Sequence, residues 1–219
     1  MLDSFIQREN KIFDILGAFS GLDYILIGGY AVSTFKHRFS VDADIVIKRK
    51  DLPDFIRILT ESGFEETISK KLENSYSTEF KRFEKSKGLT VSVDLLIDGV
   101  GIRQTGRVIP FGKLKENSEF AVVIGFEKEI KVKIPKREML MAMKLHAGRL
   151  TDLRDVAALS EKFDPEAVKG FIGDSKYAKE NVDKLISLLE DKGFMDSFKG
   201  VFMEKKFMPN VRLLKMLGS

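Results

Sequence analysis

Residues 24–48 read YILIGGYAVSTFKHRFSVDADIVIK, two apolar runs separated by a glycine pair and a short polar segment. The first run is short and continuous and ends at Gly28-Gly29, which is typical of a buried strand. The second run carries Asp42 and Asp44 among valine and isoleucine. Because side chains alternate along a strand, both carboxylates should point to one face, with Cα atoms about 7 Å apart.

The paired aspartates should destabilise the fold unless a positive charge neutralises their carboxylates. Like charges on one strand face repel, and apolar neighbours remove the water that would solvate them. Asp94, in the apolar segment TVSVDLLID, is a third carboxylate of this kind. If its strand lies beside that of Asp42 and Asp44, the three could hold two divalent cations about 3.5–4 Å apart and support an in-line phosphoryl displacement. For each aspartate taken separately, the alternative interpretation is a carboxylate that is exposed to solvent at the end or edge of a strand.

The glycine pair suits the same chemistry. Glycine lets the backbone approach a phosphate closely, and amides at the start of a following helix favour an anion. That helix is expected to be short, over residues 31–36. A glycine pair by itself is a weak signal, so we interpret it together with the aspartates.

The remaining N-terminal pattern predicts a mixed sheet flanked by helices. Apolar spacing predicts a helix over residues 3–18, and Asp51-Leu52-Pro53 is typical of a helix start. Residues 98–118 are rich in glycine, charge and turn-forming residues. Strands are expected at residues 24–27 and 41–47, in an antiparallel pair at 75–83 and 89–97, and in a hairpin at 120–124 and 129–134.

The pattern changes at Pro135, after which only helical periodicity is present. Expected helices cover residues 136–148, 151–162, 165–172 and 177–192, followed by two shorter pieces. We therefore expect an α/β (α+β) protein. Residues 1–135 should form a domain with a mixed β-sheet, and residues 136–219 a C-terminal helical bundle.

The composition narrows the classes of function. The chain has no cysteine and only two histidines, so a metal site must be built mostly of carboxylates, which favours Mg²⁺ or Mn²⁺. No apolar stretch approaches the roughly 20 residues of a membrane span, and no leader segment is evident, so we expect a cytoplasmic protein without membrane contact. Residues 99–150 hold eleven Lys and Arg against five Asp and Glu, which favours a polyanionic partner.

A resemblance to a known family follows from these motifs. Gly28-Gly29, twelve further residues and then Asp42-Ala43-Asp44, with a later carboxylate in an apolar strand, resembles the DNA polymerase beta-like nucleotidyltransferase superfamily. The finer pattern R-x-S-x-D-x-D over residues 38–44 is similar to the branch that contains the AbiEii-type toxins. The resemblance implies that residues 1–135 are a nucleotidyltransferase catalytic domain.

The segment KLHAGRLTDLRDVAAL, residues 144–159, resembles a second motif of that branch. By this resemblance Lys144 contacts the triphosphate, with Arg149 and Asp155 nearby. The segment departs from the pattern at Thr151, where such proteins often carry lysine. Two alternatives stay open: carboxylates at the start of a helix are favoured by its amides whatever the function, and Lys144 also fits a surface lysine with a partly buried stem.

Further roles are implied by the resemblance. Asp42 and Asp44 would ligate the metal, and Asp94 would hold the catalytic ion and help to deprotonate the attacking hydroxyl. The residues implied in nucleotide binding are Gly28, Gly29, Arg38, Ser40, Lys144, Arg149 and Asp155. The substrate would be a nucleoside triphosphate with Mg²⁺ or Mn²⁺, attacked at the α-phosphate by a hydroxyl with release of pyrophosphate.

The acceptor stays open at this point. The resemblance allows tRNA, a protein hydroxyl in a toxin–antitoxin pair, or a small molecule such as an antibiotic, received in a cleft between the two domains. The basic bias of residues 99–150 favours RNA. The alternative class of function is a nucleotide-binding or protein-binding module without turnover, such as an antitoxin, but such a module has no need of three carboxylates arranged for two metal ions.

Overall fold

The computed structural model describes residues 2–38, 40–70, 79–202 and 208–218. The chain forms two compact units. Unit 1 comprises Met1–Thr34, Phe39–Gly101 and Val108–Pro135, and unit 2 comprises Phe35–Arg38, Ile102–Arg107 and Lys136–Ser219. Unit 2 thus includes two short segments that precede its main helical part in the sequence.

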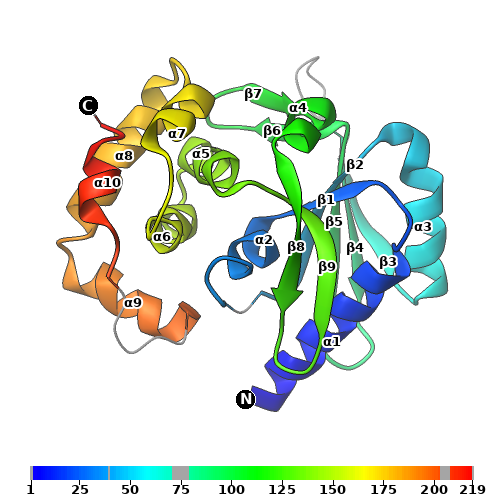
Figure 1. Cartoon of the computed structure of the whole chain (residues 1–219). Helices are drawn as coiled ribbons and strands as arrows, with labels where there is room; N and C mark the ends of the chain where they lie inside the picture. Colours follow the sequence, from blue (N-terminus) through cyan, green and yellow to red (C-terminus); the bar gives the residue numbers. More distant parts are fainter. Residues whose placement is uncertain (1, 39, 71–78, 203–207, 219) are drawn as a thin grey trace. The chain divides into compact units, whose positions relative to one another are not determined.

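Unit 1 is built on a five-stranded mixed sheet (Figure 1). In spatial order its strands are β1 (Tyr24–Ile27), β2 (Asp42–Ile47), β5 (Val91–Ile97), β4 (Glu79–Lys85) and β3 (Glu65–Lys70). Strands β2 and β5 are parallel, and the other neighbours are antiparallel. The predicted fold class, a mixed sheet with helices, is confirmed.

One face of this sheet carries the core of unit 1. Alternate side chains of β2 and β5 on this face are almost fully buried: Ala43, Ile45, Ile47, Val93, Leu95 and Ile97. The helix α1 (Leu2–Ala18) contacts β5, and Phe55 of α3 (Leu52–Glu61) packs against Phe19 and Tyr24, with ring centroids 4.8 and 6.1 Å apart. Each large side chain buried in this way stabilises the fold by about 1.5–3 kcal/mol. The opposite face of β2 carries Asp42 and Asp44.

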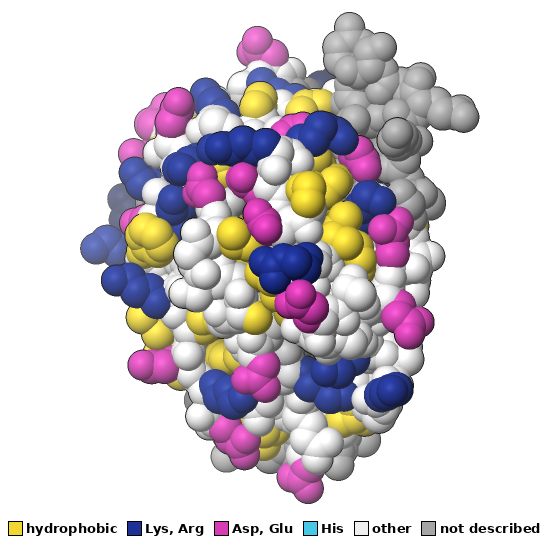
Figure 2. Space-filling view, turned by 90° about the vertical axis from the view of Figure 1, so that its right-hand side faces the viewer, with side chains coloured by type: hydrophobic (Ala, Val, Ile, Leu, Met, Phe, Trp, Pro, Cys, Tyr) yellow, Lys and Arg dark blue, Asp and Glu magenta, His cyan; other side chains and the backbone are white. Residues whose placement is uncertain are grey.

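The hairpin of β8 (Ser118–Ile124) and β9 (Glu129–Pro135) completes unit 1, and β9 lies beside β1. The predicted hairpin and the predicted helix over residues 3–18 are confirmed. On the face over α3, basic and acidic side chains are intermixed, as Figure 2 shows.

The local structure differs from the prediction at several places. Helix α2 (Gly28–Ser33) begins at the glycine pair, whereas we expected a helix only after it. The glycine-rich residues 98–118 form short elements that periodicity cannot reveal: β6 (Gly99–Ile102), β7 (Arg107–Pro110) and α4 (Phe111–Glu116). The strand β3 and the 3₁₀ turn η1 (Arg49–Asp51) were not predicted. The first part of the strand expected at residues 75–83 lies outside the described residues, and β4 covers the remainder.

Unit 2 is helical in its main part, as predicted. Its helices are α5 (Arg137–Ala147), α6 (Leu150–Leu159), α7 (Pro165–Ile172), α8 (Lys176–Leu188), α9 (Lys192–Phe202) and α10 (Val211–Lys215). Helix α5 is central because it contacts α6, α7 and α8. It ends at Gly148, whose φ of 65° is the left-handed conformation that glycine adopts readily. In the described ranges, no helix is both long and apolar enough to cross a membrane.

Candidate active site

The three predicted carboxylates lie on one face of the sheet of unit 1. In the parallel pairing of β2 with β5, Asp44 is opposite Asp94, and Asp42 is opposite Ser92. Side chains at paired positions of neighbouring strands share a face, and so do residues two apart on one strand. The strand of Asp94 does lie beside that of Asp42 and Asp44, and the sheet register brings the three residues to adjacent positions.

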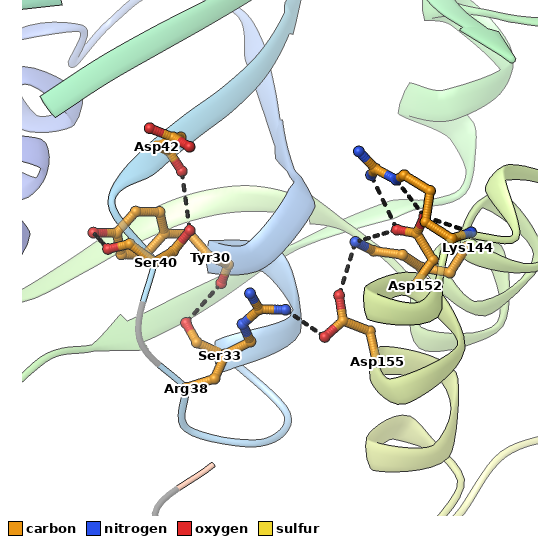
Figure 3. Close-up of polar contacts among 9 residues, drawn as sticks. Tyr30, Ser33, Arg38, Ser40, Asp42, Lys144, Asp152 and Asp155 are labelled. Atoms are coloured by element: carbon orange, nitrogen blue, oxygen red, sulfur yellow. Dashed lines mark hydrogen bonds and ion pairs between the residues drawn. The ribbon is translucent and has the colours of Figure 1, made fainter. Parts of the chain in front are cut away.

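Hydrogen bonds fix the start of β2, and Figure 3 draws those among Tyr30, Ser40 and Asp42. The Ser92 hydroxyl donates to Oδ1 of Asp42 at 2.6 Å, and the Ser40 hydroxyl donates to the carbonyl of Asp42 at 3.2 Å. The Tyr30 hydroxyl of α2 donates to the carbonyl of Ser40 at 2.7 Å. Burial first, and the charges of Glu9 and Asp42 second, raise the pKa of Tyr30, so this hydroxyl stays a donor. Ser40, predicted to contact nucleotide, here orients the strand that bears Asp42.

Gly28 is required by the position of the Asp44 carboxylate. Its φ is 68°, in the left-handed region. A Cβ atom on Gly28 would overlap Oδ2 of Asp44 and lie 2.9 Å from its Cγ. The glycine at the start of α2 thus makes room for a carboxylate from the neighbouring strand. That constraint is independent of whether Gly28 and Gly29 also contact a phosphate.

A residue that we did not predict, Arg82 of β4, holds Asp94. Its Nε donates to Oδ1 of Asp94 at 2.7 Å and its Nη2 donates to Oδ2 at 2.6 Å. Arg82 is opposite Asp94 in the antiparallel pairing of β4 with β5, which places it on the carboxylate face. The hydrogen bonds with Asp94 raise the pKa of the Arg82 guanidinium further above its ordinary value, although desolvation opposes them. Asp94 is buried, with 4% of its surface exposed.

The carboxylate face suits a hard divalent cation in its donor chemistry. Asp42 and Asp44 offer half-buried carboxylate oxygens on one face, the ligands that Mg²⁺ and Mn²⁺ prefer. Across the ranges that the structure describes, however, no three Asp, Glu or His side chains are grouped so that they could hold one ion. Both oxygens of the third predicted ligand, Asp94, are instead engaged by Arg82. In their donor chemistry Asp42 and Asp44 fit such an ion, whereas the two oxygens of Asp94 pair with Arg82 in this structure.

A second charged cluster lies within unit 2 (Figure 3). The ammonium of Lys144 on α5 contacts two carboxylates of α6, Asp155 at 2.9 Å and Asp152 at 3.2 Å. Arg38 donates to Asp155, and Nε of Arg149 donates to Asp152 at 2.6 Å. Asp152 also accepts the backbone N–H of Arg149, which satisfies one donor at the start of α6. The structure thus brings the predicted Arg38, Lys144, Arg149 and Asp155 into one network, in which Lys144 joins Asp155 to Asp152.

This cluster holds three cations and two carboxylates. Both aspartates are about 1% exposed and Lys144 is 9% exposed, so the charges depend on one another for solvation. Desolvation lowers the pKa of Lys144, but Asp155 and Asp152 outweigh it and the net pKa is raised. The Lys144 ammonium is therefore neutralised by protein carboxylates, and its predicted contact with a triphosphate stays a prediction.

The cluster makes the fold sensitive to acid. Burial raises the pKa of Asp152, but Arg149 and Lys144 outweigh it, and the net pKa lies below its ordinary value of 3.8. A carboxyl with a lowered pKa in the folded state stabilises the fold above its ordinary pKa, and this stability is lost as the pH falls through the folded value. We expect Asp152→Asn to lower the free energy of unfolding by about 2–3 kcal/mol at pH 7.

Urea unfolding at a series of pH values measures this effect. The difference between wild type and Asp152→Asn should be constant from about pH 5 upwards to pH 8 and shrink below about pH 4. Asp174→Asn, at an exposed position of the same unit, is the control and should change little. A difference that is as large at pH 3 as at pH 7 would show that the charge of Asp152 does not matter.

The comparison with known families decides the class of protein. A family model described as nucleotidyl transferase AbiEii toxin, type IV TA system, matches residues 14–197. The chain belongs to this family. It is therefore a nucleotidyltransferase of the AbiEii toxin family, and the resemblance seen in residues 38–44 is confirmed.

Solved structures agree on the fold. The crystal structure of JHP933 from Helicobacter pylori has a TM-score of 0.50 and 17% identity, and the match covers 97% of this chain and 88% of that one. The solution structure of the antibiotic-resistance factor ANT(2'')-Ia has a TM-score of 0.53 and 13% identity, over 77% of this chain and 90% of that one. At such identities the likeness shows the fold alone. No curated protein matches the sequence.

Proposed function

We propose that this AbiEii-family nucleotidyltransferase transfers a nucleoside monophosphate from a nucleoside triphosphate to a hydroxyl acceptor, and that Asp42, Asp44 and Asp94 carry the reaction. The observation that supports this assignment is the register that places Asp44 opposite Asp94, two residues from Asp42, on one face of the sheet. A fold optimised for stability alone would not collect three carboxylates there.

The roles of the residues follow from their surroundings. Asp42 and Asp44 would hold Mg²⁺ or Mn²⁺, with Ser92 orienting Asp42 and Gly28 leaving room for Asp44. When bound, the cation would neutralise the triphosphate and lower the barrier to displacement at the α-phosphate. Asp94 would accept the proton of the attacking hydroxyl. The backbone at Gly28 and Gly29 would lie against the phosphates, where the lack of side chains permits a close approach.

The charged cluster of unit 2 contains four of the residues implied in nucleotide binding. Arg38, Lys144, Arg149 and Asp155 form one network of unit 2, and their contact with the nucleotide remains a prediction. We propose that unit 1 supplies the catalytic carboxylates, as expected for a domain ending near residue 135, and that unit 2 is the helical domain.

The acceptor that a specific observation favours is RNA. Unit 1 has a hollow of about 510 Å³ lined by the end of α1 and by β9, and its lining includes Asp23, Phe120, Lys131 and Lys133. Phe120 is 65% exposed, and the ammonium groups of Lys133 and Lys131 lie 5.0 and 5.8 Å from its ring centroid. An exposed aromatic ring flanked by lysines suits a stacked base with neighbouring phosphates. A protein hydroxyl, as in a toxin–antitoxin pair, and an antibiotic are the alternative acceptors.

A labelled-substrate experiment tests the proposed reaction. The protein is incubated with each nucleoside triphosphate, labelled at the α-phosphate in one arm and at the γ-phosphate in the other, with Mg²⁺ or Mn²⁺ and either total RNA or cell lysate. We expect the α-label to reach a macromolecule, the γ-label to leave as pyrophosphate, and transfer to be lost in Asp42→Ala and Asp44→Ala. Transfer of the γ-label, or transfer that persists in both variants, would contradict the proposal.

The acceptor has its own test. We expect the double variant Lys131→Ala/Lys133→Ala to raise the KM for RNA about tenfold, because two phosphate contacts are lost, and to leave the KM for the nucleoside triphosphate unchanged. The matched control, Lys176→Ala/Lys192→Ala, removes two exposed lysines of unit 2. Equal KM values for RNA in the two double variants would remove the support for this surface as the acceptor site.

A further inference from the structure

Arg82 extends the row of charges across three strands. Asp44 on β2 is opposite Asp94 on β5, which in turn is opposite Arg82 on β4. The side chains of this row share the carboxylate face, so the guanidinium lies directly beyond the third carboxylate. Arg82 is thus adjacent to the proposed metal site without being a metal ligand itself.

In this ion pair the Asp94 side chain is buried, whereas the Arg82 side chain is partly exposed to solvent. Two parallel hydrogen bonds of 2.7 and 2.6 Å join Nε and Nη2 to the two carboxylate oxygens, the fork geometry that is strongest for arginine and carboxylate. The side chain of Asp94 is 6% exposed, whereas that of Arg82 is 31% exposed. The guanidinium can therefore contact solvent or a ligand. The buried carboxylate can pair only with a group that enters the site.

From this geometry we propose that Arg82 is a positioning residue that keeps Asp94 from the metal until nucleotide arrives, and then exchanges Asp94 for a phosphate of the nucleotide. A buried carboxylate requires a positive partner, and both oxygens of Asp94 are already engaged by Arg82. A guanidinium fits a phosphate as well as it fits a carboxylate, so the exchange leaves neither group unpaired. This inference rests on the proposed function, since Arg82 would control metal binding at the same site. We call this control of Asp94 by Arg82 the gate.

The exchange has opposite consequences for metal and for nucleotide. Without nucleotide, the metal must compete with Arg82 for Asp94, and the positive charge of Arg82 repels the metal as well, so the apparent affinity for metal is reduced. With nucleotide, Arg82 adds a phosphate contact. Removal of Arg82 should therefore strengthen metal binding and weaken nucleotide binding. An arginine that only supported the fold would weaken both when removed.

The test measures Mn²⁺ binding to the nucleotide-free protein, by the electron paramagnetic resonance signal of free Mn²⁺. We expect Arg82→Ala to bind Mn²⁺ about tenfold more tightly than wild type, and Arg82→Lys, which keeps the charge but loses the fork, to lie between them. The KM for the nucleoside triphosphate, measured at saturating metal, should rise about tenfold in Arg82→Ala. Arg57→Ala, which removes an arginine from an exposed pair on α3, is the matched control.

Each outcome is decisive. If Arg82→Ala binds Mn²⁺ with the affinity of wild type or more weakly, the gate is overturned while the proposed function stands. If neither wild type nor any variant binds Mn²⁺ without nucleotide, the gate is overturned, and the proposed function fails only if transfer of the α-label is absent as well. Should Arg82→Ala not fold, as judged by its unfolding transition, Arg82→Lys decides the same question, because the gate requires its Mn²⁺ affinity to exceed that of wild type.

Discussion

Asp44→Asn and Asp42→Asn are each expected to lower nucleotidyl transfer by at least about 10²–10³-fold without lowering the free energy of unfolding. Asparagine keeps the size of the side chain, and its carbonyl oxygen can still accept the hydrogen bond that Ser92 donates to Asp42. The negative charge alone is removed. Because the two carboxylates repel each other on one face, its loss should leave stability unchanged or raise it by up to about 1 kcal/mol.

Transfer of the α-label under saturating substrate, together with urea unfolding of the same preparations, measures both effects. Asp54→Asn, at an exposed position of α3, is the control and should affect neither quantity. A loss of transfer accompanied by destabilisation of more than about 2 kcal/mol would instead assign Asp42 and Asp44 a structural role.

Gly28→Ala is expected to lower the free energy of unfolding by about 2–3 kcal/mol and to reduce transfer by at least about tenfold. Two costs add. The left-handed conformation at φ 68° disfavours alanine by about 1–2 kcal/mol, and the new methyl group overlaps Oδ2 of Asp44, so the carboxylate must shift. A displaced carboxylate no longer has the geometry that catalysis needs.

A double-variant cycle separates these two costs. Gly28→Ala combined with Asp44→Ala removes the overlap and leaves the backbone strain, so the combined destabilisation should be smaller than the sum of the two single effects by about 1 kcal/mol or more. Gly17→Ala is the matched control, because a Cβ at Gly17 meets no atom within 4 Å and the residue lies inside α1. It should be neutral or stabilising. If the effects of Gly28→Ala and Asp44→Ala on the free energy of unfolding are strictly additive, the overlap does not destabilise the fold.

The parts of the fold that local pattern controls could be predicted from the sequence. The strand at Tyr24–Ile27 and the helix at Pro165–Ile172 are bounded by glycine or proline, and both agree with the prediction to the residue. The alternation of Asp42 and Asp44 predicted one shared face, and the two residues lie two positions apart in β2. Such features depend on periodicity and on turn residues that act within a few positions.

Features that depend on the pairing of distant segments could not be predicted. Arg82 meets Asp94 only because β4 pairs with β5 in one register, and a shift by one residue would move the arginine to the other face. The overlap of Gly28 with Asp44 likewise requires the positions of α2 and β2 together. Ser92 carried a weak signal, since it lies two residues before Asp94 and so shares its face.

The most direct test of the account is calorimetric titration of nucleoside triphosphate into the protein, with and without Mg²⁺, for wild type and for Asp42→Ala/Asp44→Ala. We expect wild type to bind the nucleotide at least about tenfold more tightly with Mg²⁺ than without it, and we expect this dependence to disappear in the double variant. Nucleotide binding that is equal with and without Mg²⁺ in wild type, or a Mg²⁺ dependence that survives in the double variant, would contradict the assignment of Asp42 and Asp44 as the metal-binding carboxylates.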